Sequence, residues 1–168
     1  MATADELIRA LNLQPHPMEG GYFRETYRSK HSHAAGSLPP GFAGPRSFKT
    51  AIYYLLTPRT FSAMHRLPGD EMFHFYLGHP VRMLQLWPDG SARTVILGSD
   101  VLGGQQPQVL VPAGVWQGCC LEPGGEFALM GTTMAPGFDY RDYETGHRDQ
   151  LIAQYPKQTE MIRRLTKT

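Results

Sequence analysis

The chain has 168 residues, a length that suits one domain and can bury a substantial core. Hydrophobic residues make up 41% of it and charged residues 18%, which is typical of a folded globular protein and excludes a disordered or fibrous one. The formal net charge of +1 provides no strong field for nucleic acid or an anionic membrane, so neither is expected as a partner.

The N-terminal segment predicts a helix over residues 3–12. Thr3 can cap it, with Glu6 three positions later, and an apolar stripe follows at helical spacing. Its acidic residues and the lack of a long apolar run argue against a signal peptide. Nowhere does the chain approach the roughly 18 apolar residues of a membrane span. A cytoplasmic location is therefore expected.

After a turn at residues 18–21, residues 22–29 alternate as a strand, and residues 30–46 predict a loop without periodicity. Short strand-like segments, separated by Gly and Pro turn signals, follow at 47–56, 60–67, 71–77, 80–87, 92–97, 107–111, 115–121 and 126–133. No helical crossover fits between them, so they predict an antiparallel sandwich or barrel. Two helical stretches, near 146–153 and 157–166, end the chain.

The two cysteines, Cys119 and Cys120, are neighbours in the sequence. Adjacent cysteines rarely close a disulfide with each other, because the geometry is strained. We expect two partly buried free thiols in a reducing compartment.

Residues 65–78 carry the chemistry that the sequence offers, in a strand, a tight turn and a second strand. His65 lies just before the turn and Glu71 just after it, so the two side chains can meet across it. Glu71 shares its side of the strand with Phe73 and Phe75, which favours an inward position. A buried carboxylate needs a cation, a hydrogen-bond donor or a proton, and His65 is the predicted partner.

The spacing in this segment resembles the first motif of the cupin superfamily. His65 is followed by Leu67, three residues, Glu71, six residues and Gly78. Leu67 stands where the motif has its second histidine, and Arg59 stands where it has its leading glycine.

The second cupin motif is matched by residues 112–117, with Gln117 in the place of its last histidine. Further segments are similar to the cupin type 5 group, long labelled a domain of unknown function: 18–27, 52–56, 65–71, 107–114 and 135–138. The resemblance implies an all-β fold, the cupin double-stranded β-helix or jelly-roll barrel, as a single domain over residues 1–168 with a short N-terminal helix and C-terminal helices. It also implies a polar pocket and a homodimer, and it brings no established reaction.

Three functions remain open for this pocket, and one of them uses a metal. By position, the cupin metal site would consist of His65, Glu71 and Gln117, since Leu67 cannot ligate. One imidazole, one carboxylate and an amide make a poor cage, so a divalent metal cofactor is not favoured. His74 lies three residues after Glu71, which directs it to the opposite face of a regular strand.

The leading hypothesis needs no metal. Some cupin-like sugar-nucleotide epimerases and isomerases use a histidine in the barrel as general base. Here His65 would abstract a proton next to a carbonyl, with Glu71 orienting it, because an imidazole titrates near neutral pH. Tyr53 or Tyr76 would supply a general acid, and Gln117 would bind the substrate. The ligand would be small and polar, such as a carbohydrate or nucleotide sugar.

The alternative is a protein that binds a small molecule without reacting with it. Phe73, Phe75 and Trp116 could then supply apolar walls. A metal-dependent cupin enzyme is the third interpretation. In a purely structural interpretation, His65 and Glu71 form a buried pair that has no role in binding a ligand. Whether the chain is an enzyme is left open by the sequence, because a fold does not determine a reaction.

Overall fold

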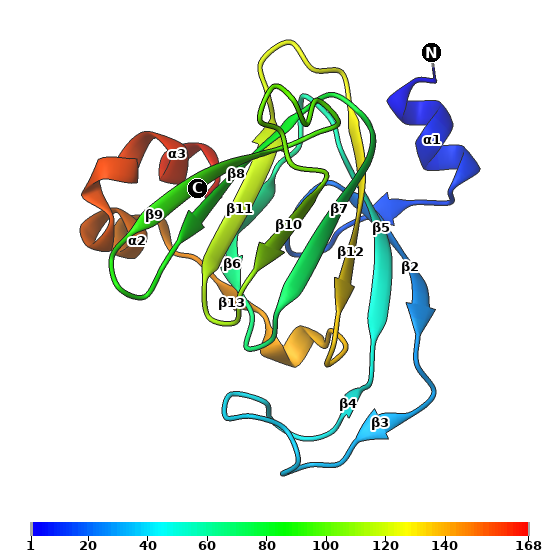
Figure 1. Cartoon of the computed structure of the whole chain (residues 1–168), viewed down its shortest axis with the longest axis vertical. Helices are drawn as coiled ribbons and strands as arrows, with labels where there is room; N and C mark the ends of the chain where they lie inside the picture. Colours follow the sequence, from blue (N-terminus) through cyan, green and yellow to red (C-terminus); the bar gives the residue numbers. More distant parts are fainter. Residues whose placement is uncertain (1, 168) are drawn as a thin grey trace.

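The computed structural model describes residues 2–167 as two antiparallel sheets that face each other, the jelly-roll arrangement expected from the sequence (Figure 1). The six-stranded sheet has the order β1-β2-β5-β12-β7-β10 and the five-stranded sheet the order β13-β6-β11-β8-β9. The strands of the first sheet are β1 (Gln14–Pro15), β2 (Tyr22–Arg28), β5 (Thr50–Leu56), β12 (Ala128–Met134), β7 (Glu71–Gly78) and β10 (Gln108–Val111). Those of the second are β13 (Glu144–Thr145), β6 (Ser62–Arg66), β11 (Trp116–Leu121), β8 (Val81–Leu86) and β9 (Ala92–Leu97).

Every strand predicted from residue 22 onward is present. The strand at 92–97 is predicted with its exact bounds, and the ends of the others differ by at most three residues. The predicted loop 30–46 contains a small extra pair, β3 (Ser32–His33) and β4 (Arg46–Ser47), which extends beyond the larger sheet (Figure 1). The helices are α1 (Ala4–Ala10), α2 (Arg148–Gln154) and α3 (Thr159–Arg164), and Thr3 and Glu6 form the predicted capping box of α1. Within residues 2–167, no helix has the length and apolar character needed to cross a bilayer.

Three apolar clusters hold the fold together, each on one face of a sheet. The largest fills the space between the sheets and includes Tyr54, Phe73, Val81, Met83, Val95, Leu97, Val109, Cys119 and Met130. The helices α2 and α3 cover the outer face of the smaller sheet, and α1 covers one end of the larger sheet (Figure 1). Burial of this apolar surface is the main driving force for folding. Both cysteines are free and buried, as predicted, with Cys119 facing inward and Cys120 toward the helices.

A row of polar residues interrupts the apolar interior of the smaller sheet. His65 on β6 pairs with Gln117 on β11, and Gln117 pairs in turn with Gln85 on β8. All three side chains are buried, at 2%, 2% and 0% exposure. Buried polar groups need hydrogen-bond partners to offset the loss of water. This polar row therefore indicates that this part of the interior has a role other than apolar packing.

A buried polar cavity between the sheets

The cavity beside this row has a volume of about 70 Å³. Strands β2, β5, β6, β7 and β12 form its walls, together with the segment 138–143 that follows β12. Its lining combines titratable and aromatic side chains: His16, Glu19, Phe23, Glu25, Arg28, His65, Glu71, Phe138, Tyr140 and Tyr143. Small-molecule sites have this mixture of apolar walls with a few polar groups.

An ion pair between His65 and Glu19 lies at the cavity wall. His65 Nε2 is 3.0 Å from Glu19 Oε1, which also accepts a hydrogen bond of 3.0 Å from the Ser62 hydroxyl. His65 Nδ1 lies 2.7 Å from the carbonyl oxygen of Ala63. Both ring nitrogens therefore face acceptors, and the ring satisfies both only as the doubly protonated imidazolium.

The electrostatics agree with this protonation state. Burial alone would lower the pKa of His65, but the Glu19 carboxylate outweighs it and, with smaller contributions from Glu71 and the Ala63 carbonyl, raises that pKa to about 9. Burial also opposes ionisation of Glu19, yet the His65 cation holds the pKa of Glu19 below its ordinary value. The pair is therefore ionised at neutral pH.

Glu19 reaches the interior because of the two glycines that follow it. Gly20 has φ +100° and Gly21 has φ +70°, a backbone region that favours glycine. A Cβ atom on Gly20 would lie 2.4 Å from the carbonyl oxygen of Phe61. The Ala63 amide also donates to the Glu19 carbonyl oxygen at 2.9 Å. The turn is therefore packed tightly against the strand that carries His65, and this packing places the carboxylate inside.

Glu71, at the start of β7, is the second buried carboxyl of the cavity, with 7% exposure. Gln117 Nε2 donates a hydrogen bond of 2.6 Å to Glu71 Oε2. Burial raises the pKa of Glu71, and the nearby Glu19 carboxylate raises it further. Glu71 therefore takes up a proton more readily than an ordinary carboxyl group does.

His16 completes the polar wall as a neutral ring. Its Nδ1 accepts hydrogen bonds from the amides of Glu19 (2.9 Å) and Met18 (3.3 Å), so its proton is on Nε2. Burial lowers the pKa of His16 despite the Glu19 carboxylate. The ring packs against Phe23 with a centroid distance of 4.6 Å. His16 thus helps to hold the turn that carries Glu19.

The segment 138–143 supplies an aromatic wall. Tyr143 stacks on His65 with a centroid distance of 4.8 Å and an interplanar angle of 15°. Phe138 and Tyr140 meet edge to face at 5.0 Å, and Tyr140 is 44% exposed. An aromatic wall of this kind suits a ligand with a planar or ring-shaped part.

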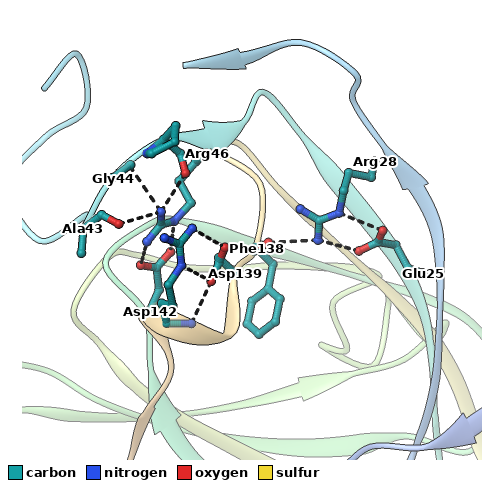
Figure 2. Close-up of polar contacts among 10 residues, drawn as sticks. Glu25, Arg28, Ala43, Gly44, Arg46, Phe138, Asp139 and Asp142 are labelled. Carbon is teal, nitrogen blue, oxygen red and sulfur yellow. Dashed lines mark hydrogen bonds and ion pairs between the residues drawn. The ribbon is translucent and has the colours of Figure 1, made fainter. Parts of the chain in front are cut away.

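Figure 2 shows how this segment is fixed to the rest of the molecule. Arg46 pairs with Asp142 through both of its fork nitrogens and donates to the carbonyl oxygens of Ala43 and Gly44. Arg28 bridges Glu25 on its own strand and the carbonyl oxygen of Phe138. Arg46 is buried, whereas Arg28 is exposed. The aromatic wall is thus anchored by the bidentate contact of Arg46 with Asp142, which defines direction as well as distance, and by a single hydrogen bond from Arg28 to Phe138.

The structure brings together three of the residues predicted for the site. His65 and Glu71 line the cavity and the buried Gln117 contacts Glu71, but the pairing differs from the prediction. His65 pairs with Glu19, and Glu71 accepts a hydrogen bond from Gln117. Glu19, His16 and Tyr143 were not predicted as site residues. The signal available for Glu19 was its place before two consecutive glycines.

The other predicted ligand-binding residues lie elsewhere. Tyr53 and Tyr76 face each other at 6.1 Å on the outer face of the larger sheet, where they line a separate surface depression with Leu11 and Leu129. Phe73 is 1% exposed and belongs to the apolar core. His74 points away from the cavity and contacts the Thr133 hydroxyl at 3.0 Å, as its spacing from Glu71 predicted.

The residues at the cupin metal positions fit a transition metal poorly. Both nitrogens of His65 face acceptors already, Gln117 directs its amide nitrogen toward Glu71, and Leu67 is buried and apolar. Within the described part of the chain, no group of three or more His, Cys, Asp or Glu side chains is arranged to hold a metal ion. The donor chemistry instead resembles that of an acid–base site.

The fold and the cavity together define a jelly-roll protein with a polar pocket inside the barrel, which is the architecture of the cupins. The chain belongs to the family described as "Cupin superfamily (DUF985)", which matches residues 5–146. This confirms the resemblance found in the sequence.

Relatives with known structures share the whole fold. A hypothetical protein from Leishmania major is 31% identical with a TM-score of 0.89, over 99% of this chain and 100% of that chain. Protein SO0799 from Shewanella oneidensis is 34% identical with a TM-score of 0.86, over 99% of both chains. The uncharacterized yeast protein YML079W from Saccharomyces cerevisiae is 31% identical over 150 residues, which is 84% of this chain and 74% of that protein.

More distant structures share the fold alone. Oxalate decarboxylase from Bacillus subtilis is 14% identical with a TM-score of 0.54, over 92% of this chain and 37% of that chain. A dTDP sugar isomerase from Desulfovibrio desulfuricans is 18% identical with a TM-score of 0.52, over 77% of this chain and 83% of that chain.

Proposed function

We propose that the chain binds a small, polar, carbonyl-bearing molecule in the cavity and isomerises or epimerises it by proton transfer. The observation that carries this proposal is the pairing in the cavity wall. One carboxylate, Glu19, is committed to the His65 cation, while the other, Glu71, lines the same cavity with a raised pKa. Two carboxyl groups whose environments push their pKa values apart are typical of acid–base catalysis.

We assign the base to Glu71 rather than to His65. Both nitrogens of His65 donate in this arrangement, so the ring has no lone pair to accept a proton. Glu71 accepts a hydrogen bond from Gln117 at Oε2 and a further contact from the Thr132 hydroxyl, and these orient the carboxyl group while its lone pairs stay able to take up a proton. A base with a pKa closer to neutrality also drives proton transfer better than an ordinary carboxylate.

In this reaction Glu71 removes the proton from the carbon next to the ligand carbonyl. The electron pair of the broken C–H bond forms a C=C bond, and the carbonyl π electrons move to the oxygen. Both N–H groups of His65 are already bound, to Glu19 and to the Ala63 carbonyl, so another donor in the cavity must stabilise that negative charge. Return of the proton from Glu71 to the other face of the same carbon gives the epimer. The isomer forms when Glu71 returns the proton to the former carbonyl carbon and the hydroxyl proton of the first carbon moves to the former carbonyl oxygen, which makes the first carbon the new carbonyl.

The lining of the cavity supports a carbohydrate-like ligand. Its aromatic wall offers a surface for stacking, beside a few polar groups that can bind hydroxyl and carbonyl oxygens. The dTDP sugar isomerase shares the fold, and its name supports the choice of dTDP-sugars as first probes by analogy.

The test is hydrogen exchange in D₂O. The protein is incubated with a panel of dTDP-linked hexoses and keto-hexoses, and loss of each C–H signal is followed by proton NMR beside a heat-denatured sample. We expect at least one panel member to lose the proton next to its carbonyl faster with the native protein. Saturable binding without exchange in any panel member would contradict the proposal and favour a non-catalytic binding protein.

A further inference from the structure

Tyr143 carries a polar group that the fold itself does not use. Its hydroxyl oxygen is buried and has no hydrogen-bond partner among residues 2–167. A buried hydroxyl without a partner destabilises the fold, because it has lost its hydrogen bonds to water. By contrast, the hydroxyl of Tyr54 donates to the Gly20 carbonyl oxygen and that of Tyr155 to the Trp87 carbonyl oxygen, both at 2.7 Å.

The position of this hydroxyl links it to the reacting groups. The Tyr143 ring lines the cavity and lies parallel to the His65 imidazole. Burial raises the pKa of Tyr143, and the carboxylates of Glu19 and Glu71 raise it further, so the hydroxyl keeps its proton and stays a donor. A protonated donor without a partner, on a residue of the cavity wall, is suited to an oxygen atom that carries negative charge.

The wall that holds Tyr143 is rigidly supported. Tyr143 immediately follows Asp142, which is held by the buried Arg46, and precedes β13, which pairs with the strand of His65. Preorganised donors stabilise a developing charge without the cost of reorienting when it forms. The support therefore suits a residue that contacts a ligand.

We propose that the Tyr143 hydroxyl donates a hydrogen bond to the carbonyl oxygen of the bound ligand, beside the carbon whose proton Glu71 removes. This inference rests on the proposed function for its chemistry and extends it to the substrate class, which must present a carbonyl oxygen to Tyr143. During the reaction the hydroxyl keeps its proton and stabilises the oxygen that receives the carbonyl π electrons. The proton removed from carbon goes to Glu71.

The first test uses stability without any ligand. Tyr143→Phe removes an unpartnered hydroxyl and is expected to unfold at the same urea concentration as the wild type or at a higher one. Tyr155→Phe is the matched control, because it removes a hydroxyl that is hydrogen-bonded, and it is expected to unfold at a lower concentration. If Tyr143→Phe loses as much stability as Tyr155→Phe, the hydroxyl has a structural partner and the inference is wrong.

The second test reports on ligand contact. Protein labelled with ¹³C at tyrosine Cζ is titrated with oxalate, a planar anion that resembles an enediolate, and with the dTDP-sugar panel. We expect the Tyr143 resonance, assigned with Tyr143→Phe, to shift on saturation, and the exchange rate to fall about 100–1,000-fold in the variant. An unmoved resonance with every probe, or an unchanged exchange rate, overturns the inference. A shift with oxalate but no exchange in the wild type supports the contact and rejects only the proposed reaction.

Discussion

Replacing Glu19 with glutamine is expected to destabilise the protein by about 3–5 kcal/mol at pH 7, because it leaves the buried His65 cation without its counter-charge. Glutamine keeps the size of the side chain and can still accept from Ser62 through its amide oxygen. The change therefore removes the charge and little else. Urea unfolding followed by tryptophan fluorescence measures the difference in free energy of unfolding.

The matched control is Glu144→Gln, which breaks the exposed ion pair with Arg66. Exposed pairs contribute about 0–1 kcal/mol, so this control is expected to unfold nearly as the wild type does. A loss no larger in Glu19→Gln than in Glu144→Gln would show that the buried pair is not ionised in the folded protein.

The pH dependence of stability tests the His65–Glu19 ion pair independently. The pKa of His65 is about 9 in the fold against 6.5 for an ordinary histidine. That difference corresponds to about 3 kcal/mol, fully present below pH 6.5 and lost as the pH rises through 9. The wild type is therefore expected to lose stability over this range, and its advantage over Glu19→Gln is expected to shrink.

Replacing Glu71 with glutamine is expected to lower the exchange rate about 10²–10⁴-fold, the usual contribution of a positioned general base. The amide oxygen can still accept from Gln117, so ligand affinity is expected to change little. Because burial raises the pKa of Glu71, its ionisation costs stability at neutral pH, and the variant is expected to be at least as stable as the wild type.

Exchange rates, affinities and urea midpoints are compared for the wild type, Glu71→Gln and the exposed control Glu160→Gln. The control is expected to match the wild type in all three. A Glu71→Gln protein that exchanges protons at the wild-type rate would exclude Glu71 as the base and return that role to another group in the cavity.

Alternation and turn signals were enough to predict the strands and an antiparallel sandwich or barrel, and the resemblance to the cupins specified the jelly roll. β7 places apolar residues on alternate positions, and glycine or proline interrupts the chain between strands. The inward position of Glu71 followed from the same alternation, and the structure shows it buried. Local periodicity also separated His74 from the cavity.

The partners in the site could not be predicted in the same way. Glu19 is 46 residues before His65, and a carboxylate beside two glycines has the appearance of an exposed turn. Only the tight contact of Gly20 with Phe61 turns it inward, and that contact is set by tertiary packing. The position of Tyr53 and Tyr76 outside the cavity could not be predicted for a related reason. Alternation gives the two faces of a strand, but it does not say which face the cavity uses.

The most direct test of the site is the titration of His65 by NMR, with ¹⁵N-labelled histidine and assignment through His65→Gln. An imidazole that stays doubly protonated through neutral pH, with a pKa of about 9, is the result expected of the His65–Glu19 ion pair. A ring that loses its proton at or below pH 6.5 would contradict it, because a neutral His65 beside Glu19 would have a free lone pair and could itself be the base.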